Sequence, residues 1–208
     1  MDGVFMRRMI GRVLFCLILA ASFWTGTLIA DKQTLRQELV RLHVVGASDS
    51  QEDQTMKLRL KDAIVESLRS DLAKLSDAQE AKTYLSENLP KIEAFANRFL
   101  QEAGCEDAAQ VSLATEEFAA RVYDTFTLPA GVYDALRITI GQGEGKNWWC
   151  VVFPGLCIPA TSEGFEAAAS CAGFSDSLTA ALEGEAGYEI RFWVLDALGR
   201  LENFLHRA

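Results

Sequence analysis

The spacing of apolar residues changes once along this chain, and the change limits the elements from which a fold can be built. Across residues 56–75, apolar side chains recur every three or four positions, the period of a helix with one buried face. Leu136, Ile138 and Ile140 instead alternate with polar neighbours, the period of a half-buried strand. The sequence therefore predicts an α+β domain, with helices before a mostly antiparallel sheet.

The first half of this domain is predicted to hold one strand and three helices. The β-branched segment 42–45 is bounded by Gly46 and is typical of a strand. Capping residues or proline mark where each following helix begins. These starts are Asp49 or Ser50, then Ser76 with Gln79, then Pro90.

The second half is predicted to form the sheet and a closing helix. The glycine-rich segment 141–147 suits a turn, so the strands 136–140 and 148–153 are expected to form a hairpin. A last strand is predicted over 188–194, running into a C-terminal helix. Small residues dominate 159–187, which is expected to be a variable loop with a short helix after Ser175. Residues 31–208 are therefore predicted to be a single domain.

The first thirty residues have the pattern of an export segment. Arg7, Arg8 and Arg12 precede an uncharged apolar stretch over residues 13–30. A basic start followed by an apolar run is typical of a signal peptide, and eighteen residues is also the short end of a membrane-crossing helix. Residues 1–30 are thus either a cleaved signal peptide or an N-terminal anchor, and either one places the domain outside the cytoplasm.

The exported part is strongly acidic. The whole chain has 20 basic and 29 acidic side chains, and removing Arg7, Arg8, Arg12 and Asp2 leaves a net charge of −11. Such a domain is not expected to bind nucleic acid or anionic lipid heads, so it should meet the membrane only through residues 1–30. Its expected partner is a protein surface.

Four of the five cysteines lie in the exported part, where disulfides are stable. Three pairings are possible. Cys150 and Cys157 are the candidate pair, because Pro154 and Gly155 between them favour a turn. No Cys-x-x-Cys occurs, and His43 and His206 lack ligand spacing, so neither a metal site nor a cofactor is predicted.

The residue types also give little sign of catalysis. His43 and His206 are the only imidazoles available to activate a nucleophile. Cys150 with His43 would be the pair of a cysteine-dependent cell-wall hydrolase, yet Cys150 lies among bulky apolar residues that disfavour a thiolate. The chain is therefore predicted not to be an enzyme, and the hydrolase is kept as the alternative.

Trp148 and Trp149 are adjacent on a predicted strand, so their side chains should point to opposite faces. Two outcomes are open. Both rings can be covered within the domain, or one can be left for a partner, since aromatic residues dominate protein cores and interfaces alike.

Three blocks of this sequence resemble the stage II sporulation protein R family of endospore-forming bacteria. They are LHVVGASDSQEDQ at 42–54 with KLRLKDA at 57–63, PAGVYDALRITIG at 129–141, and GEGKNWWCVVFPGLC at 143–157. The predicted export segment and the segment 188–194 also fit. Gly155 departs from the family, which commonly has a second proline there.

The resemblance implies a signalling role between two cells. Such a protein is made in the forespore and exported into the space between the forespore and mother-cell membranes. There it activates the outward-facing part of a membrane-embedded aspartic-type protease, which cleaves the precursor of an early mother-cell sigma factor. Under this hypothesis the candidate contact residues are Asp49, Ser50, Asp53, Asn147, Trp148 and Trp149. A structural role in the spore envelope is a further alternative.

Overall fold

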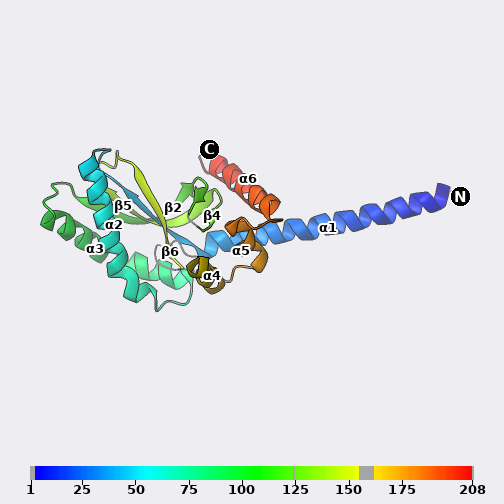
Figure 1. Ribbon diagram of the computed structural model, residues 1–208, viewed down its shortest axis with the longest axis horizontal. Helices are drawn as coiled ribbons and strands as arrows, with labels where there is room; N and C mark the ends of the chain where they lie inside the picture. The colour runs from blue at the N-terminus through cyan, green and yellow to red at the C-terminus, as the bar shows by residue number, and fades with distance from the viewer. Residues whose placement is uncertain (1–2, 124, 155–161, 208) are drawn as a thin grey trace.

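The computed structural model describes residues 3–123, 125–154 and 162–207. A long helix, α1 (Gly3–Glu38), projects from an α+β domain, and its N-terminal end lies far from the sheet (Figure 1). Residues 31–38, which follow the predicted export segment, are the last part of this helix. The α+β class predicted from the sequence is confirmed.

A mixed four-stranded sheet lies at the centre of the domain. Its strand order is β2 (Ala109–Phe118), β5 (Gly131–Ile140), β1 (Val40–Val45) and β6 (Asn147–Phe153). β1 runs parallel to β5 and antiparallel to β6, and β2 is antiparallel to β5.

The prediction that the strands 136–140 and 148–153 form a hairpin is wrong. These strands belong to β5 and β6, and β1 lies between them. Every residue of β1 is buried. In the centre of the sheet, β1 is covered on both faces and paired with a neighbouring strand along both edges. The stabilisation from this burial outweighs the preference of residues 141–147 for a tight hairpin turn.

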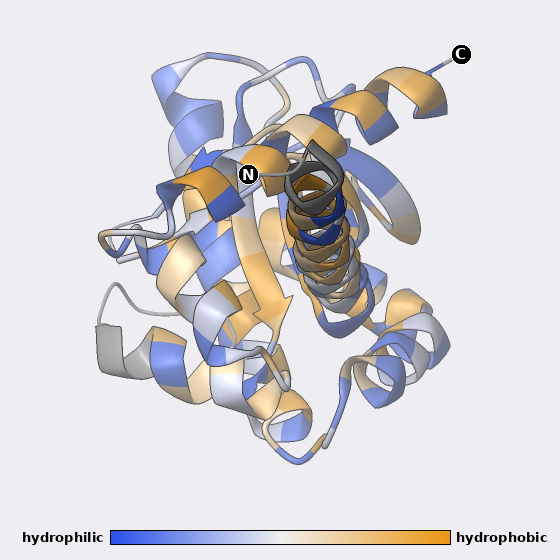
Figure 2. Cartoon of the chain, turned by 90° about the vertical axis from the view of Figure 1, so that its right-hand side faces the viewer, coloured by the Kyte–Doolittle hydropathy of each residue, from blue (hydrophilic) through white to orange (hydrophobic). Residues whose placement is uncertain are grey.

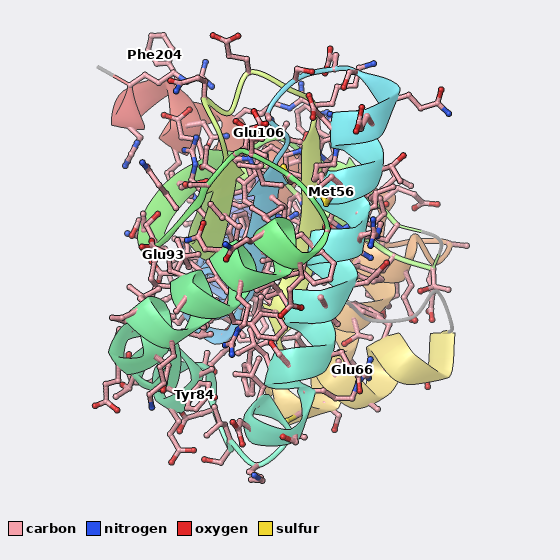
Figure 3. All side chains as sticks on the ribbon, turned by 90° about the vertical axis from the view of Figure 1, so that its left-hand side faces the viewer. Met56, Glu66, Tyr84, Glu93, Glu106 and Phe204 are labelled. Atoms are coloured by element: carbon pink, nitrogen blue, oxygen red, sulfur yellow. The ribbon has the colours of Figure 1, made fainter. Side chains whose placement is uncertain are left out.

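Two helices cover one face of the sheet, α2 (Gln51–Leu72) and α3 (Ala78–Glu102), as Figure 3 shows. Ser50 caps α2, since its hydroxyl accepts a hydrogen bond from the Asp53 N–H, so this predicted start is confirmed. The core between helices and sheet is apolar. It includes Val40, Leu42, Val44, Leu60, Ile64, Leu85, Ile92, Leu100 and Ile138.

The second and third predicted helices are one helix, so the prediction that a helix begins at Pro90 is wrong. Pro90 lies inside α3 and lacks the N–H that would continue the backbone ladder. Leu85 and Ile92, on either side of it, are both buried in the same core. Their packing stabilises the continuous helix against the cost of the proline.

The start of α3 also differs from the predicted capping box. Asp77 is the N-cap, and its carboxylate accepts a hydrogen bond from the Glu80 N–H at 2.8 Å. The Glu80 carboxylate in turn accepts one from the Ser76 N–H at 2.9 Å. The N-cap is therefore Asp77, one residue later than predicted, and Glu80 bonds back to Ser76, the residue before that cap.

The other face of the sheet is covered by the end of α1 and three C-terminal helices. These are α4 (Ser162–Cys171), α5 (Asp176–Glu183) and α6 (Glu189–His206). Their core includes Leu28, Leu35, Phe118, Tyr133, Val151, Phe165, Leu178 and Leu195. A two-stranded ribbon of β3 (Arg121–Val122) and β4 (Thr127–Leu128) lies beside them.

Two predictions for this region are wrong. The segment expected as a strand over 188–194 is the start of α6, because its apolar residues also fit a helix that buries Leu195 and Gly199. The expected loop over 159–187 holds α4 and α5, although residues 159–161 lie outside the described part. The short helix predicted after Ser175 is confirmed as α5, with Ser175 as its N-cap.

Candidate functional site

Two segments that are far apart in sequence meet at one end of the sheet. β1 and β5 both end there and β6 begins there, so the connection 141–146 must cross the end of β1. Gly145 N–H donates to the Gly46 carbonyl at 2.9 Å, and Glu144 N–H donates to the Ala47 carbonyl at 3.2 Å. Residues 46–53 and 141–147 together are called the loop junction below.

Side chains from α2 and the segment before it fasten the loop junction. Asp49 accepts a hydrogen bond from the Lys146 N–H at 2.7 Å. Lys57 donates from Nζ to the Lys146 carbonyl at 2.8 Å and to Gln54 Oε1 at 2.5 Å. Burial of the Lys57 amine lowers its pKa, although the nearby Asp49 charge acts in the opposite direction.

Ser50 and Asp53, two of the predicted contact residues, have structural partners of their own. Ser50 caps α2, and the Asp53 carboxylate accepts a hydrogen bond from the Ser48 hydroxyl. With Asp49 bound to Lys146, all three predicted residues of this segment hold the loop in place. The hydrogen bonds of these three residues hold the loop junction in one conformation at the protein surface.

The two adjacent tryptophans lie on opposite faces of the sheet. Trp148 is 38% exposed, and Lys61 Nζ on α2 lies 5.0 Å from its ring centroid. Trp149 is half-buried and stacks on His43 with ring centroids 3.8 Å apart. Asn147, just before them, is exposed at the start of β6. Trp149 is thus covered by the fold, whereas Trp148 and Asn147 are accessible.

A polar cluster beneath Trp149 was missed from the sequence. His43 Nδ1 lies 2.8 Å from Glu116 Oε2, and Arg137 Nη1 lies 3.3 Å from Glu116 Oε1. Burial raises the pKa of Glu116, but hydrogen bonds and charge from His43 and Arg137 outweigh it and hold the pKa below its usual value.

The deepest member of this cluster is Arg41, which is fully buried. Its Nη2 donates to the Tyr123 hydroxyl at 2.7 Å, and its guanidinium lies 4.2 Å from the Phe118 ring centroid. Arg41 and His43 alternate with Leu42 and Val44 along β1. This alternation in the sequence could have indicated that one face of β1 is polar.

The sheet separates Cys150 from His43, which removes the cysteine-hydrolase alternative. In the β1–β6 register Cys150 pairs with Leu42, and His43 pairs with Trp149. Neighbouring residues of a strand point to opposite faces, so the Cys150 side chain lies with the α2–α3 core and the His43 ring lies on the other face. These two groups cannot form a thiolate–imidazolium pair.

The predicted Cys150–Cys157 disulfide stays a prediction, because Cys157 lies outside the described residues. Cys105 and Cys171 carry free thiols. In the described parts of the chain, no group of three or more His, Cys, Asp or Glu side chains is arranged to hold a metal ion.

Comparison with known proteins shows which part of the chain is shared with a protein family. The family described as Stage II sporulation protein R (spore_II_R) matches residues 36–163. The chain belongs to this family. A Stage II sporulation protein R of Bacillus subtilis (strain 168) is 33% identical over 127 residues, which cover 61% of this chain and 57% of that protein. No solved structure matches.

The match to the Stage II sporulation protein R family includes the whole sheet, α2, α3 and the loop junction. The helices α5 and α6 lie beyond it, as does most of α1. The family resemblance of the three sequence blocks is thereby confirmed, whereas the segment 188–194 lies beyond the match. The accessible residues Asn147 and Trp148 fall within the shared part.

Proposed function

We propose that this chain is an exported sporulation signal which activates a membrane-embedded aspartic-type protease. That protease would process the precursor of an early mother-cell sigma factor. The observation that carries the proposal is the family match over residues 36–163, which begins in the last turn of α1, after its apolar run. The domain acts here as a ligand of the protease.

Export is supported by the N-terminal helix. The stretch Arg8–Glu38 of α1 is long and apolar enough to cross a membrane, and basic residues precede its apolar run. A signal sequence and an anchor share these properties. Either one would deliver the domain to the space between the forespore and mother-cell membranes.

The loop junction with Trp148 is the surface we assign to the protease. Asn147 and Trp148 are exposed, and Glu144 and Lys146 project from the same connection. A tryptophan that is accessible beside a rigid, hydrogen-bonded loop is the type of residue that dominates binding energy at interfaces. Activation requires that this surface bind the active form of the protease more tightly than the inactive one.

Reconstitution in a non-sporulating host tests the proposal. The chain is co-expressed with the candidate protease and the sigma-factor precursor, and precursor cleavage is followed by immunoblot. We expect cleavage with the full chain and none when residues 1–30 are deleted. A competent protease that leaves the precursor intact beside the folded, exported chain would overturn the function.

The contact surface is tested separately in the same assay. Trp148→Ala should abolish or strongly reduce cleavage. Leu58→Ala is the matched control, because Leu58 on α2 has the same exposed fraction of 38%. Equal cleavage with both variants would remove Trp148 from the surface and leave the signalling role standing, provided that circular dichroism shows both variants folded.

A further inference from the structure

The helix α1 does not end where its apolar run ends. Its last turns belong to the core of the domain, since Leu28 and Leu35 are each 2% exposed, and Leu39 directly after the helix is 3% exposed. On exposed sides of the helix, Trp24, one turn before Leu28, is 43% exposed, and Ile29, directly after Leu28, is 58% exposed. The apolar helix therefore passes without a break into the domain, which would lose the buried side chain of Leu28 if residues 1–30 were removed.

Ion pairs fix α6 beside this transition. Arg191 Nη2 lies 2.5 Å from Asp31 Oδ2, and both side chains are about one-tenth exposed. Farther along α6, Glu202 lies 3.1 Å from Lys32 Nζ and 3.4 Å from Arg36 Nη1, which is on a later turn of α1. The first turn of α6 is therefore level with the point where the exposed apolar part of α1 ends, and α6 then continues away from that point (Figure 1).

The first turns of α6 also carry unpartnered apolar side chains. Ile190 and Trp193 are both 68% exposed, and they lie three positions apart, on one side of the helix. The view along α1 shows hydrophobic residues on both α1 and α6 where the two helices pass each other (Figure 2). Tryptophan is enriched where proteins meet the membrane–water interface.

We propose that α1 is retained as a membrane anchor and that Ile190 and Trp193 insert into the interfacial layer of the same bilayer. The bilayer is the occupant because Ile190 and Trp193 are held level with Ile29, at the end of the apolar part of α1. This contact adds to the attachment through residues 1–30 that the sequence predicts, and it holds the domain against the membrane at two places.

The attraction at this contact is apolar. The acidic domain is repelled by anionic lipid heads, and Glu189 beside Ile190 is exposed. Burial of apolar side chains among the lipids overcomes this repulsion without a basic patch. The contact should therefore persist in high salt, which would weaken an electrostatic one.

The far end of the same helix provides an internal control. Phe204 is 70% exposed and points away from the domain (Figure 3). It lies about 16 Å beyond Trp193 at the α-helical rise of 1.5 Å per residue. Because α6 leads away from the end of the span, Phe204 should remain in water.

Site-specific labelling of the full chain tests the proposal. Cys16, Cys105 and Cys171 are replaced by serine, and one new cysteine is introduced by Ile190→Cys, Phe204→Cys or Val122→Cys. Each variant is labelled with an environment-sensitive fluorophore and reconstituted into phosphatidylcholine–phosphatidylglycerol vesicles that contain spin-labelled lipids. The chain without a new cysteine measures background labelling.

We expect a blue-shifted emission and strong quenching at position 190, and neither at positions 204 and 122, in low and in high salt. Quenching at 190 no stronger than at 122 would overturn the membrane contact, and so would equal quenching at 190 and 204. Mass spectrometry of the chain recovered from cells should show residues 1–30 still attached. A chain cut within α1 would refute the retained anchor, while the precursor-cleavage assay above judges the signalling role independently.

Discussion

The Asp49 carboxylate accepts a hydrogen bond from the backbone N–H of Lys146 at 2.7 Å, across 97 positions of sequence. This contact joins the segment before α2 to the connection that crosses the end of β1. Two blocks through which the chain resembles its family thus form one structure. Their conformation depends on how closely the two backbones approach.

Gly145→Ala should disrupt the loop junction. A Cβ atom at Gly145 would lie 2.2 Å from the Ser48 carbonyl oxygen and 2.9 Å from the Gly46 carbonyl oxygen. Both neighbours are backbone atoms, so the loops must separate, at a cost of about 1–3 kcal/mol in unfolding free energy. Urea unfolding measures the loss. Gln142→Ala, at an exposed position of the same connection, should leave the midpoint unchanged, and a Gly145→Ala midpoint equal to wild type would contradict the close approach.

Lys57→Met should weaken the same region through lost hydrogen bonds. Methionine keeps the apolar stem but leaves the Lys146 carbonyl and Gln54 Oε1 without the amine. We expect a loss of about 1–3 kcal/mol, the usual cost of leaving buried polar groups unpaired. Thermal unfolding checks this value against Lys91→Met, which changes an exposed lysine on α3. A more stable Lys57→Met protein would show that desolvation of the buried amine dominates.

Glu116 should make the fold sensitive to acid. Its pKa in the folded protein is below the ordinary value of 4.5, so the folded state holds its proton less tightly than the unfolded chain. The stability that it contributes is present above pH 4.5 and is lost as the pH falls through the lowered pKa. Asp134 is shifted in the same direction and accounts for part of the total loss.

Glu116→Gln isolates this contribution. The variant should be less stable than wild type at neutral pH, and its stability should fall less steeply as the pH drops below 4.5. Urea unfolding across this pH range is the measurement, with the exposed Glu144→Gln as the control that keeps the wild-type slope. Parallel curves for wild type and Glu116→Gln would show that the ion pairs with His43 and Arg137 do not contribute.

Gly199→Ala should separate α6 from the sheet. A Cβ atom there would lie 1.6 Å from the Ala130 carbonyl oxygen, just before β5. The nearby hydrogen bond from the Ala130 N–H to Asp196, 2.8 Å long, would be strained by the same displacement. We expect a loss of about 1–3 kcal/mol and faster proteolysis within α6. Leu201→Ala, on the exposed side of α6, should match wild type, and a protease-resistant Gly199→Ala chain would contradict the contact.

The sequence predicted a structural element correctly where that element depends on contacts between residues a few positions apart. Ser50 caps α2 as predicted, and the alternation over 136–140 predicts a strand that is part of β5. The opposite orientation of Trp148 and Trp149 follows from strand geometry alone. For the candidate site, the sequence indicated the right segments but could not show that Asp49, Ser50 and Asp53 are occupied in holding a loop.

Where two patterns were compatible with the same residues, packing decided. Residues 190–194 fit both a strand and a helix, and the helix forms because it buries Leu195 and Gly199 against distant segments. Pro90 would end an isolated helix, yet α3 continues because apolar residues on both sides of it share one core. In each case a non-local contact outweighs a local preference.

The sequence by itself determined the α+β class, the apolar helix at the N-terminus and the family of the chain, because periodicity, charge and motifs are properties of neighbouring residues. Only the tertiary structure decided that β1 lies between β5 and β6, that Cys150 and His43 face opposite sides, and that α6 starts beside the end of the apolar helix. These relationships depend on which distant surfaces bury each other, and no stretch of neighbouring residues encodes that choice.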